Sequence, residues 1–185
     1  MLDLVLFQEK LLTEGFIMAA SDRTIYDRIK VSPQVLYSNN VNKERVLYRG
    51  ILFNAMLREF HTLLDFDKAV TIRLCKIKGR NVSGRYQSGY KLVELEYTSC
   101  MAEMTEWLAH ELVHAEQYHT KKLEAVWVSG KGWKQTWNGK VCNNKGTTYA
   151  AYRNLPWEEE AFKRQKELAN TVYDRLTKQG YKLEA

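Results

Sequence analysis

Apolar residues recur at helical spacing in three parts of the chain and predict its main helices. Two of these helices are expected over about 43–64 and about 100–118, the second preceded by Thr98 and Ser99 as capping residues. The third is expected from Pro156, since proline favours the first helical turn, to about Lys178. The 100–118 helix has the clearest buried stripe: Met101, Met104, Leu108, Leu112 and Ala115.

Alternating apolar and polar positions predict strands over 69–77 and 90–97. Two further stretches, 123–128 and 133–141, read as paired strands with a hairpin turn at Asn138-Gly139. A short helix is expected over 2–14, and the segment 22–41 is ambiguous. This order of elements predicts an α+β fold. We expect an N-terminal helical segment over 1–65 and a second part over 66–185, together forming one compact unit.

The composition is that of an ordinary globular chain: 185 residues, 45% of them hydrophobic and 27% charged. No apolar run approaches the roughly 18 residues that span a bilayer, so we expect no membrane segment. The start, MLDLVLFQEK, lacks the basic region of a cleaved signal peptide. The odd number of cysteines, three, fits a reducing compartment. A cytoplasmic location is therefore expected.

Positive charge is concentrated in two segments. Residues 120–185 account for the whole net charge of +6, and the segment 68–91 has seven basic residues and no acid. Within 121–153 the lysines alternate with Trp127, Trp133, Trp137 and Tyr152. Such a surface attracts nucleic acid, although scattered lysines on a solvated face explain the same pattern. Nucleic acid is accordingly a candidate partner through 68–91 and 121–153.

The predicted helix over 100–118 carries the motif His110-Glu111-Leu112-Val113-His114. Residues four apart lie one turn apart on the same helix face, so both imidazoles can reach one metal ion. The glutamate between them lies where it can accept a proton from a water held by that ion. Tetrahedral zinc then requires one more protein ligand.

Glu158, Glu159 and Glu160 are the candidates for that ligand. On a helical wheel Glu158 lies within about 40° of Phe162, Gln165, Ala169, Val172 and Leu176, on the inward face. Glu159 and Glu160 lie about 100° and 200° away from it. A lone carboxylate on an inward face is costly unless it is paired or bound to metal, which favours Glu158. The alternative is that all three are simply acids of the first helical turn, where the helix dipole favours negative charge.

An HExxH helix followed by a helix that carries a glutamate ligand resembles the gluzincin family of zinc metallopeptidases. Glu158 and Ala161 resemble the ExxA(D) segment whose first glutamate is the ligand in small gluzincins. The stretches WKQTWNGK and LPWEEEA are similar to compact metallopeptidase-like proteins of bacteriophage and plasmid genomes. The resemblance covers roughly 69–170. It departs at Phe162, where many relatives have an aspartate that orients a ligand histidine.

This resemblance implies a zincin-like fold, in which a small twisted sheet packs on the HExxH helix and the C-terminal helix carries the third ligand. It implies one Zn²⁺ per chain on His110, His114 and Glu158, and hydrolysis of peptide bonds with Glu111 as general base. The strand over 90–97 would be an edge strand that binds a peptide or protein substrate in extended form. Either Tyr149 or Tyr152 is a candidate for stabilising the oxyanion; packing is the alternative role for both.

Two other functions stay open at this point. The chain is also compatible with a virion or assembly protein that keeps a zincin fold for structure, with 1–65 as the docking element. The second is a nucleic-acid-associated protease, which the basic segments 68–91 and 121–153 suggest. The intact Glu111 argues against the first, since a purely structural zinc site needs no base. His61 and His119 are expected to have no part in the metal site.

Overall fold

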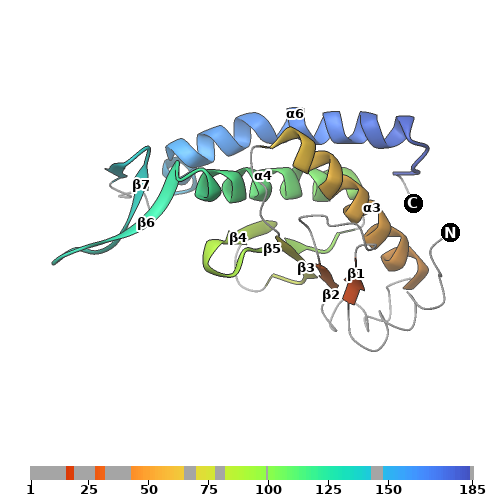
Figure 1. The fold of residues 1–185 in the computed structure, drawn as a ribbon, viewed down its shortest axis with the longest axis horizontal. Helices are drawn as coiled ribbons and strands as arrows, with labels where there is room; N and C mark the ends of the chain where they lie inside the picture. Colours follow the sequence, from red (N-terminus) through yellow and green to blue (C-terminus); the bar gives the residue numbers. More distant parts are fainter. Residues whose placement is uncertain are drawn as a thin grey trace.

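The computed structural model of the chain describes residues 16–18, 28–31, 43–64, 70–77, 82–98, 100–142 and 148–183 (Figure 1). The predicted helix over 2–14 lies outside the described residues, as does most of the ambiguous segment 22–41. Helices and two sheets occur together, and the α+β prediction is confirmed. No helix of the described ranges combines the length and apolar character that crossing a membrane requires.

The larger sheet has five strands in the order β1-β2-β3-β5-β4. Their bounds are β1 Phe16–Met18, β2 Arg28–Val31, β3 Thr71–Cys75, β5 Leu92–Glu96 and β4 Gly84–Gln87. Strands β2, β3 and β5 are parallel, and β1 and β4 are antiparallel to their neighbours at the two ends. The strands predicted over 69–77 and 90–97 are thus present, as β3 and β5. Two strands from the segment 1–65 join the same sheet, through the pairing of β2 with β3.

One expectation about this sheet is wrong. The strand over 90–97 was expected at an edge, but β5 lies between β3 and β4, and β4 is the terminal strand. The sequence of β4, Gly-Arg-Tyr-Gln, lacks the alternation of apolar residues that predicts a strand. It is held by antiparallel backbone pairing with β5, in which Gly84 lies opposite Leu95.

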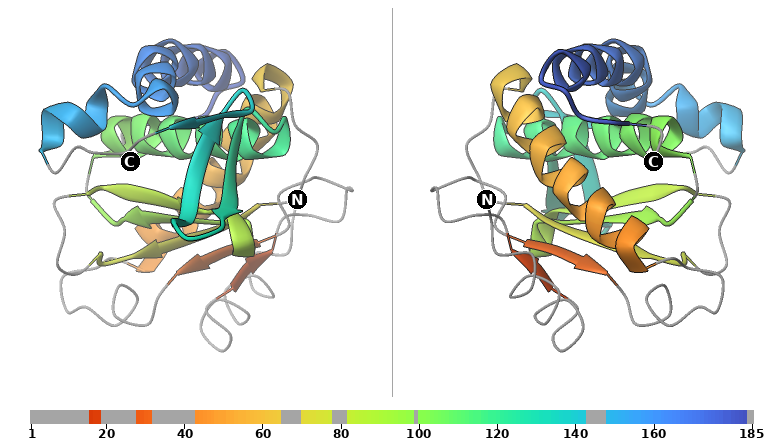
Figure 2. Two further views of the ribbon diagram at one scale, coloured as in Figure 1. Left: turned by 90° about the vertical axis from the view of Figure 1, so that its left-hand side faces the viewer. Right: turned by 90° about the vertical axis from the view of Figure 1, so that its right-hand side faces the viewer.

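Helix α4 (Met101–His119) lies between the larger sheet and helix α6 (Pro156–Lys178), which forms the outermost layer (Figures 1 and 2). Helix α3 (Lys43–Leu63) packs against both of these helices and against β2. These three helices match the predicted ranges within two residues. The residue at the N-cap of α4 is Cys100, whose backbone N–H donates to Thr98 Oγ1 at 3.4 Å.

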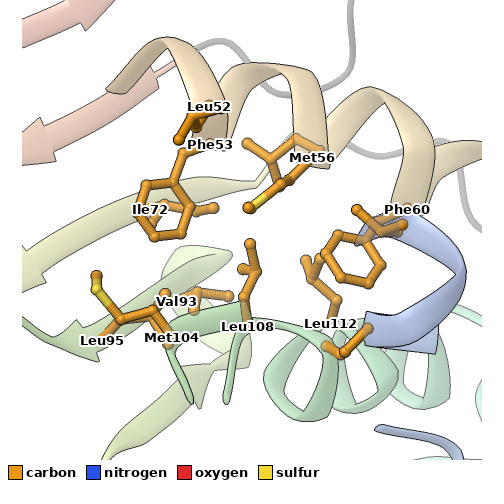
Figure 3. Close-up of a cluster of buried hydrophobic side chains, with 14 of the residues drawn as sticks. Leu52, Phe53, Met56, Phe60, Ile72, Val93, Leu95, Met104, Leu108 and Leu112 are labelled. Carbon is orange, nitrogen blue, oxygen red and sulfur yellow. The ribbon is translucent and has the colours of Figure 1, made fainter. Parts of the chain in front are cut away.

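The core fills the space between α3, α4 and the inner face of the sheet (Figure 3). Its buried side chains come from all three: Leu52, Phe53, Met56 and Phe60 of α3; Ile72, Val93 and Leu95 of the sheet; and Met104, Leu108 and Leu112 of α4. Burial of this apolar surface fixes α4 on the sheet. The motif-bearing face of α4 is therefore turned toward α6.

A separate antiparallel sheet, β6 (Leu123–Val128), β7 (Gly132–Trp137) and β8 (Lys140–Cys142), follows α4. The predicted Asn138-Gly139 turn is present, and both residues have the positive φ that a two-residue hairpin turn requires. It joins β7 to β8, so the single strand predicted over 133–141 is two strands. The β6–β7 hairpin projects beyond the end of α4 (Figure 1). A short helix, α5 (Tyr149–Arg153), precedes α6, and a 3₁₀ turn, η1 (Ser88–Tyr90), follows β4.

Candidate metal centre

Two imidazoles from α4 and one carboxylate from α6 converge in the buried layer between these helices. His110 Nε2 lies 3.1 Å from His114 Nε2 and 3.2 Å from Glu158 Oε2. The second carboxylate oxygen, Glu158 Oε1, lies 3.4 Å from His114 Nε2. All three side chains are buried, and within the described ranges they are the one group of three metal-ligating side chains close enough to share an ion.

Each imidazole is oriented by a glutamine through its other ring nitrogen. His114 Nδ1 lies 2.9 Å from Gln117 Oε1, and His110 Nδ1 lies 2.9 Å from Gln165 Oε1. The amide of Gln117 is fixed, because its nitrogen donates to the carbonyl of Trp157 at 3.0 Å. An amide oxygen only accepts, so each Nδ1 carries the proton and each Nε2 of a neutral ring presents a lone pair to the cluster.

The cluster therefore brings together three acceptors that need a shared positive charge. Burial by itself would raise the pKa of Glu158, but interactions with His110 and His114 outweigh it and hold this pKa at about 2. The balancing charge is either a proton on an Nε2 atom or a metal ion. Two imidazoles and one carboxylate are the protein ligands of many catalytic zinc sites, and this group can hold a metal ion.

Glu111 lies beside this group and against the edge strand β4. Its side chain is buried, and a Cβ atom at Gly84 would lie 3.0 Å from both its Cγ and its Oε1. The backbone N–H of Tyr86 donates to its carboxylate. Burial raises the pKa of Glu111, although the nearby His114 and His110 act in the opposite direction. Glycine at position 84 thus allows the carboxylate to pack directly on the β4 backbone.

An open cleft of about 210 Å³ gives access to His110 and Glu111. Its lining combines residues at and just before the start of β4 with Gln165 and aromatic side chains of α4, α5 and α6: Val82, Ser83, Gly84, Trp107, Tyr149, Tyr152, Phe162 and Gln165. Both tyrosines proposed for oxyanion binding line this cleft. Tyr152 is hydrogen-bonded to Glu158, and its burial together with this carboxylate raises its pKa.

The three consecutive glutamates of α6 lie in different surroundings. Glu158 belongs to the group that can hold a metal ion, and Glu159 is exposed. Glu160 is half-buried and accepts hydrogen bonds from Lys122 Nζ at 2.7 Å and Gln117 Nε2 at 3.0 Å. Glu160 therefore acts indirectly, because it fixes the amide that orients His114. His119 is exposed at the end of α4, and His61 lies on α3; neither belongs to the group.

Phe162 occupies the position at which many gluzincins have an aspartate. Its ring centroid lies 4.6 Å from that of His110, and the guanidinium of Arg153 lies 4.1 Å from the Phe162 ring centroid. His110 Nδ1 instead donates a hydrogen bond to Gln165 Oε1, three residues further along α6. Sequence reasoning assigned no role to Gln165 or Gln117. The one sequence feature that pointed to Gln165 was its inward position on the helical wheel, on the same face as Glu158.

Comparisons of the chain with protein-family models, with curated proteins and with solved structures gave no match. Any functional assignment consequently rests on the geometry of the site.

Proposed function

We propose that the chain is a zinc-dependent metallopeptidase of the gluzincin type, with one Zn²⁺ held by His110, His114 and Glu158. The observation that carries this proposal is the convergence of three ligand atoms beside a second acid, Glu111, at an open cleft. Two neutral imidazoles and a carboxylate supply the borderline and hard donors that zinc accepts. The glutamine partners orient both Nε2 atoms toward the ion in advance.

Zinc bound at such a site lowers the pKa of water and polarises a peptide carbonyl. Glu111 supplies the base: its carboxylate takes a proton from a water molecule in the cleft and later donates it to the amine nitrogen of the departing peptide. The carboxylate is held in place by the backbone N–H of Tyr86 and by contact with Gly84. The tyrosines Tyr149 and Tyr152 remain the candidate donors to the oxyanion.

The proposed substrate is a peptide that binds in extended form along β4. This strand ends the sheet, and Gly84 at its start lines the cleft and contacts Glu111. A terminal strand offers backbone donors and acceptors to an added strand. Pairing there would bring a peptide backbone past the metal-ligating group.

A purely structural metal site is less well supported by the same geometry. Structural zinc sites are closed by four protein ligands, whereas this group has three and borders an open cleft. A buried glutamate beside the ligands also has no structural use there. A role as a virion or assembly protein therefore leaves the buried Glu111 unexplained, whereas the peptidase role uses it as the base.

The test compares the wild-type protein with Glu111→Gln in two assays. Elemental analysis of both proteins should give about one zinc per chain, because the three ligands are unchanged. Digestion of a mixed peptide library, read by mass spectrometry, should show cleavage by the wild type and a rate at least about 10²-fold lower for Glu111→Gln. Equal cleavage by both proteins would refute the base assignment, and absence of zinc from both would refute the site.

A further inference from the structure

The β6–β7 hairpin carries two largely exposed tryptophans whose rings contact each other. Trp127 and Trp133 face one another across the two strands, with ring centroids 5.8 Å apart and planes inclined by 74°. The exposed fractions of these residues are 64% and 69%. Large aromatic surfaces are normally withdrawn from water, and a cluster left exposed is typical of an interaction site.

The same face of the hairpin is covered near the body of the protein. Trp137 lies on it, opposite Leu123, and its ring contacts Trp157 of α6 at a centroid distance of 6.5 Å. Lys122 Nζ lies 5.5 Å from the Trp137 ring. This inner part anchors the sheet, while the far end of the β6–β7 hairpin extends beyond α4 and α6 (Figure 1). The exposed pair is therefore not needed to hold the hairpin in place.

The charge around the pair is strongly one-sided. Residues 121–142 include five lysines and a single acid, Glu124. Lys131 is exposed in the turn at the hairpin tip, and Lys140 is exposed on β8. Alternation along β6 places Glu124 on the face opposite to Trp127. The hairpin thus presents two aromatic rings in a positive field, which favours a partner that is a polyanion with flat apolar groups.

We propose that the Trp127–Trp133 pair and its surrounding lysines bind single-stranded nucleic acid. Each indole offers a ring face on which one unpaired base stacks, and the lysines neutralise the neighbouring phosphates. Because the two rings are steeply inclined, they receive two separate bases and not one. In a duplex the base faces are already stacked, so a single strand is the form that this pair recognises. This binding site is separate from the metal centre and does not depend on peptidase activity.

The test measures fluorescence anisotropy of a fluorescein-labelled 20-nucleotide oligothymidine with the full-length protein at several salt concentrations. Trp127→Ala/Trp133→Ala should weaken binding at least about tenfold, because two stacking platforms are lost. Lys131→Gln/Lys140→Gln, which changes the exposed lysine of the hairpin tip and the one on the tryptophan face, should weaken binding and flatten its salt dependence. Lys178→Gln/Lys182→Gln, near the opposite end of α6, is the matched control. It should leave the affinity and its salt dependence unchanged. Circular dichroism verifies that each variant keeps its helices.

Four results would overturn the proposal. The first is absence of binding by the wild type at about 50 mM salt, where phosphate contacts are strong. The second is equal affinity of the wild type and the tryptophan variant, since charge alone would then account for binding. The third is binding to vesicles containing phosphatidylserine without binding to the oligonucleotide, which would identify the hairpin as a membrane-surface element. Equal affinity for a duplex of the same length would likewise exclude base stacking.

Discussion

His110 of α4 and Gln165 of α6 are joined by a hydrogen bond of 2.9 Å between Nδ1 and the amide oxygen. The bond crosses the interface that also contains Glu158, so α6 supplies both the proposed third ligand and a group that orients the first. An aspartate at position 162 is therefore unnecessary for fixing His110, and Phe162 instead packs on the imidazole.

This bond predicts the effect of removing the orienting group. Gln165→Leu should lower zinc affinity about 10- to 100-fold, because the imidazole loses the partner that fixes its tautomer and direction. Gln165→Glu keeps an acceptor opposite Nδ1 and should retain most of the affinity. Competition titration with a chromophoric chelator measures both. Equal affinities for wild type and Gln165→Leu would show that Phe162 packing alone orients His110.

The surroundings of the three glutamates predict unequal effects on metal binding. Glu158→Ala should abolish stable zinc retention during dialysis, since it removes one of three ligands from a buried group. Glu159→Ala, one residue further along the same helix turn and exposed, is the matched control and should retain the metal. Mass spectrometry measures the zinc content of both variants after dialysis. Retention by Glu158→Ala would place the third ligand elsewhere.

The contact between Gly84 and Glu111 predicts an effect on catalysis that leaves the metal in place. In Gly84→Ala the new methyl group would lie 3.0 Å from Glu111 Oε1, so the carboxylate must shift. Displacement of the proposed base should lower kcat at least about tenfold. Gly89→Ala is the control, because a Cβ at position 89 meets nothing within 4 Å. A Gly84→Ala variant with the kcat of the wild type would contradict the proposed position of the base.

Glu94 on β5 predicts a pH-dependent contribution to stability. It is buried between Arg73 and Arg85 and accepts a hydrogen bond from Gln87 Nε2 at 2.7 Å. Burial raises its pKa, but Arg85 and the other partners outweigh this and hold the pKa below its ordinary value. A carboxyl group whose pKa is lower in the folded state than in the unfolded state stabilises the fold at pH values above its unfolded-state pKa. This stabilisation is lost as the pH falls through the folded-state pKa.

Glu94→Gln should accordingly reduce the free energy of unfolding by on the order of 1 kcal/mol at pH 7, a modest effect because both arginines are partly exposed. The difference from wild type should shrink as the pH is lowered below about 4.5, the ordinary value for this carboxyl. Urea titrations at several pH values measure it. Glu103→Gln, an exposed acid on α4, is the control. A difference that is constant across the pH range would exclude the ionic contribution.

The sequence predicts those parts of the site that depend on one helix alone. The i, i+4 spacing of His110 and His114 and the inward position of Glu158 follow from helical geometry without knowledge of the packing. The roles of Gln117 and Gln165 required the packing of α4 on α6, which no local pattern reveals. Strand β4 escaped prediction for a related reason, since its place in the sheet is set by pairing with β5 and not by its own residues.

The proposed ion would also act as a cross-link within the chain. His110 and Glu158 are 48 positions apart, and the segment between them includes the entire β6–β8 sheet. A ligand bond that joins its two ends turns this segment into a closed loop, and closure reduces the number of conformations available to the open chain. Zinc removal should therefore speed hydrogen exchange in the hairpin strands, although these strands supply none of the three proposed ligands.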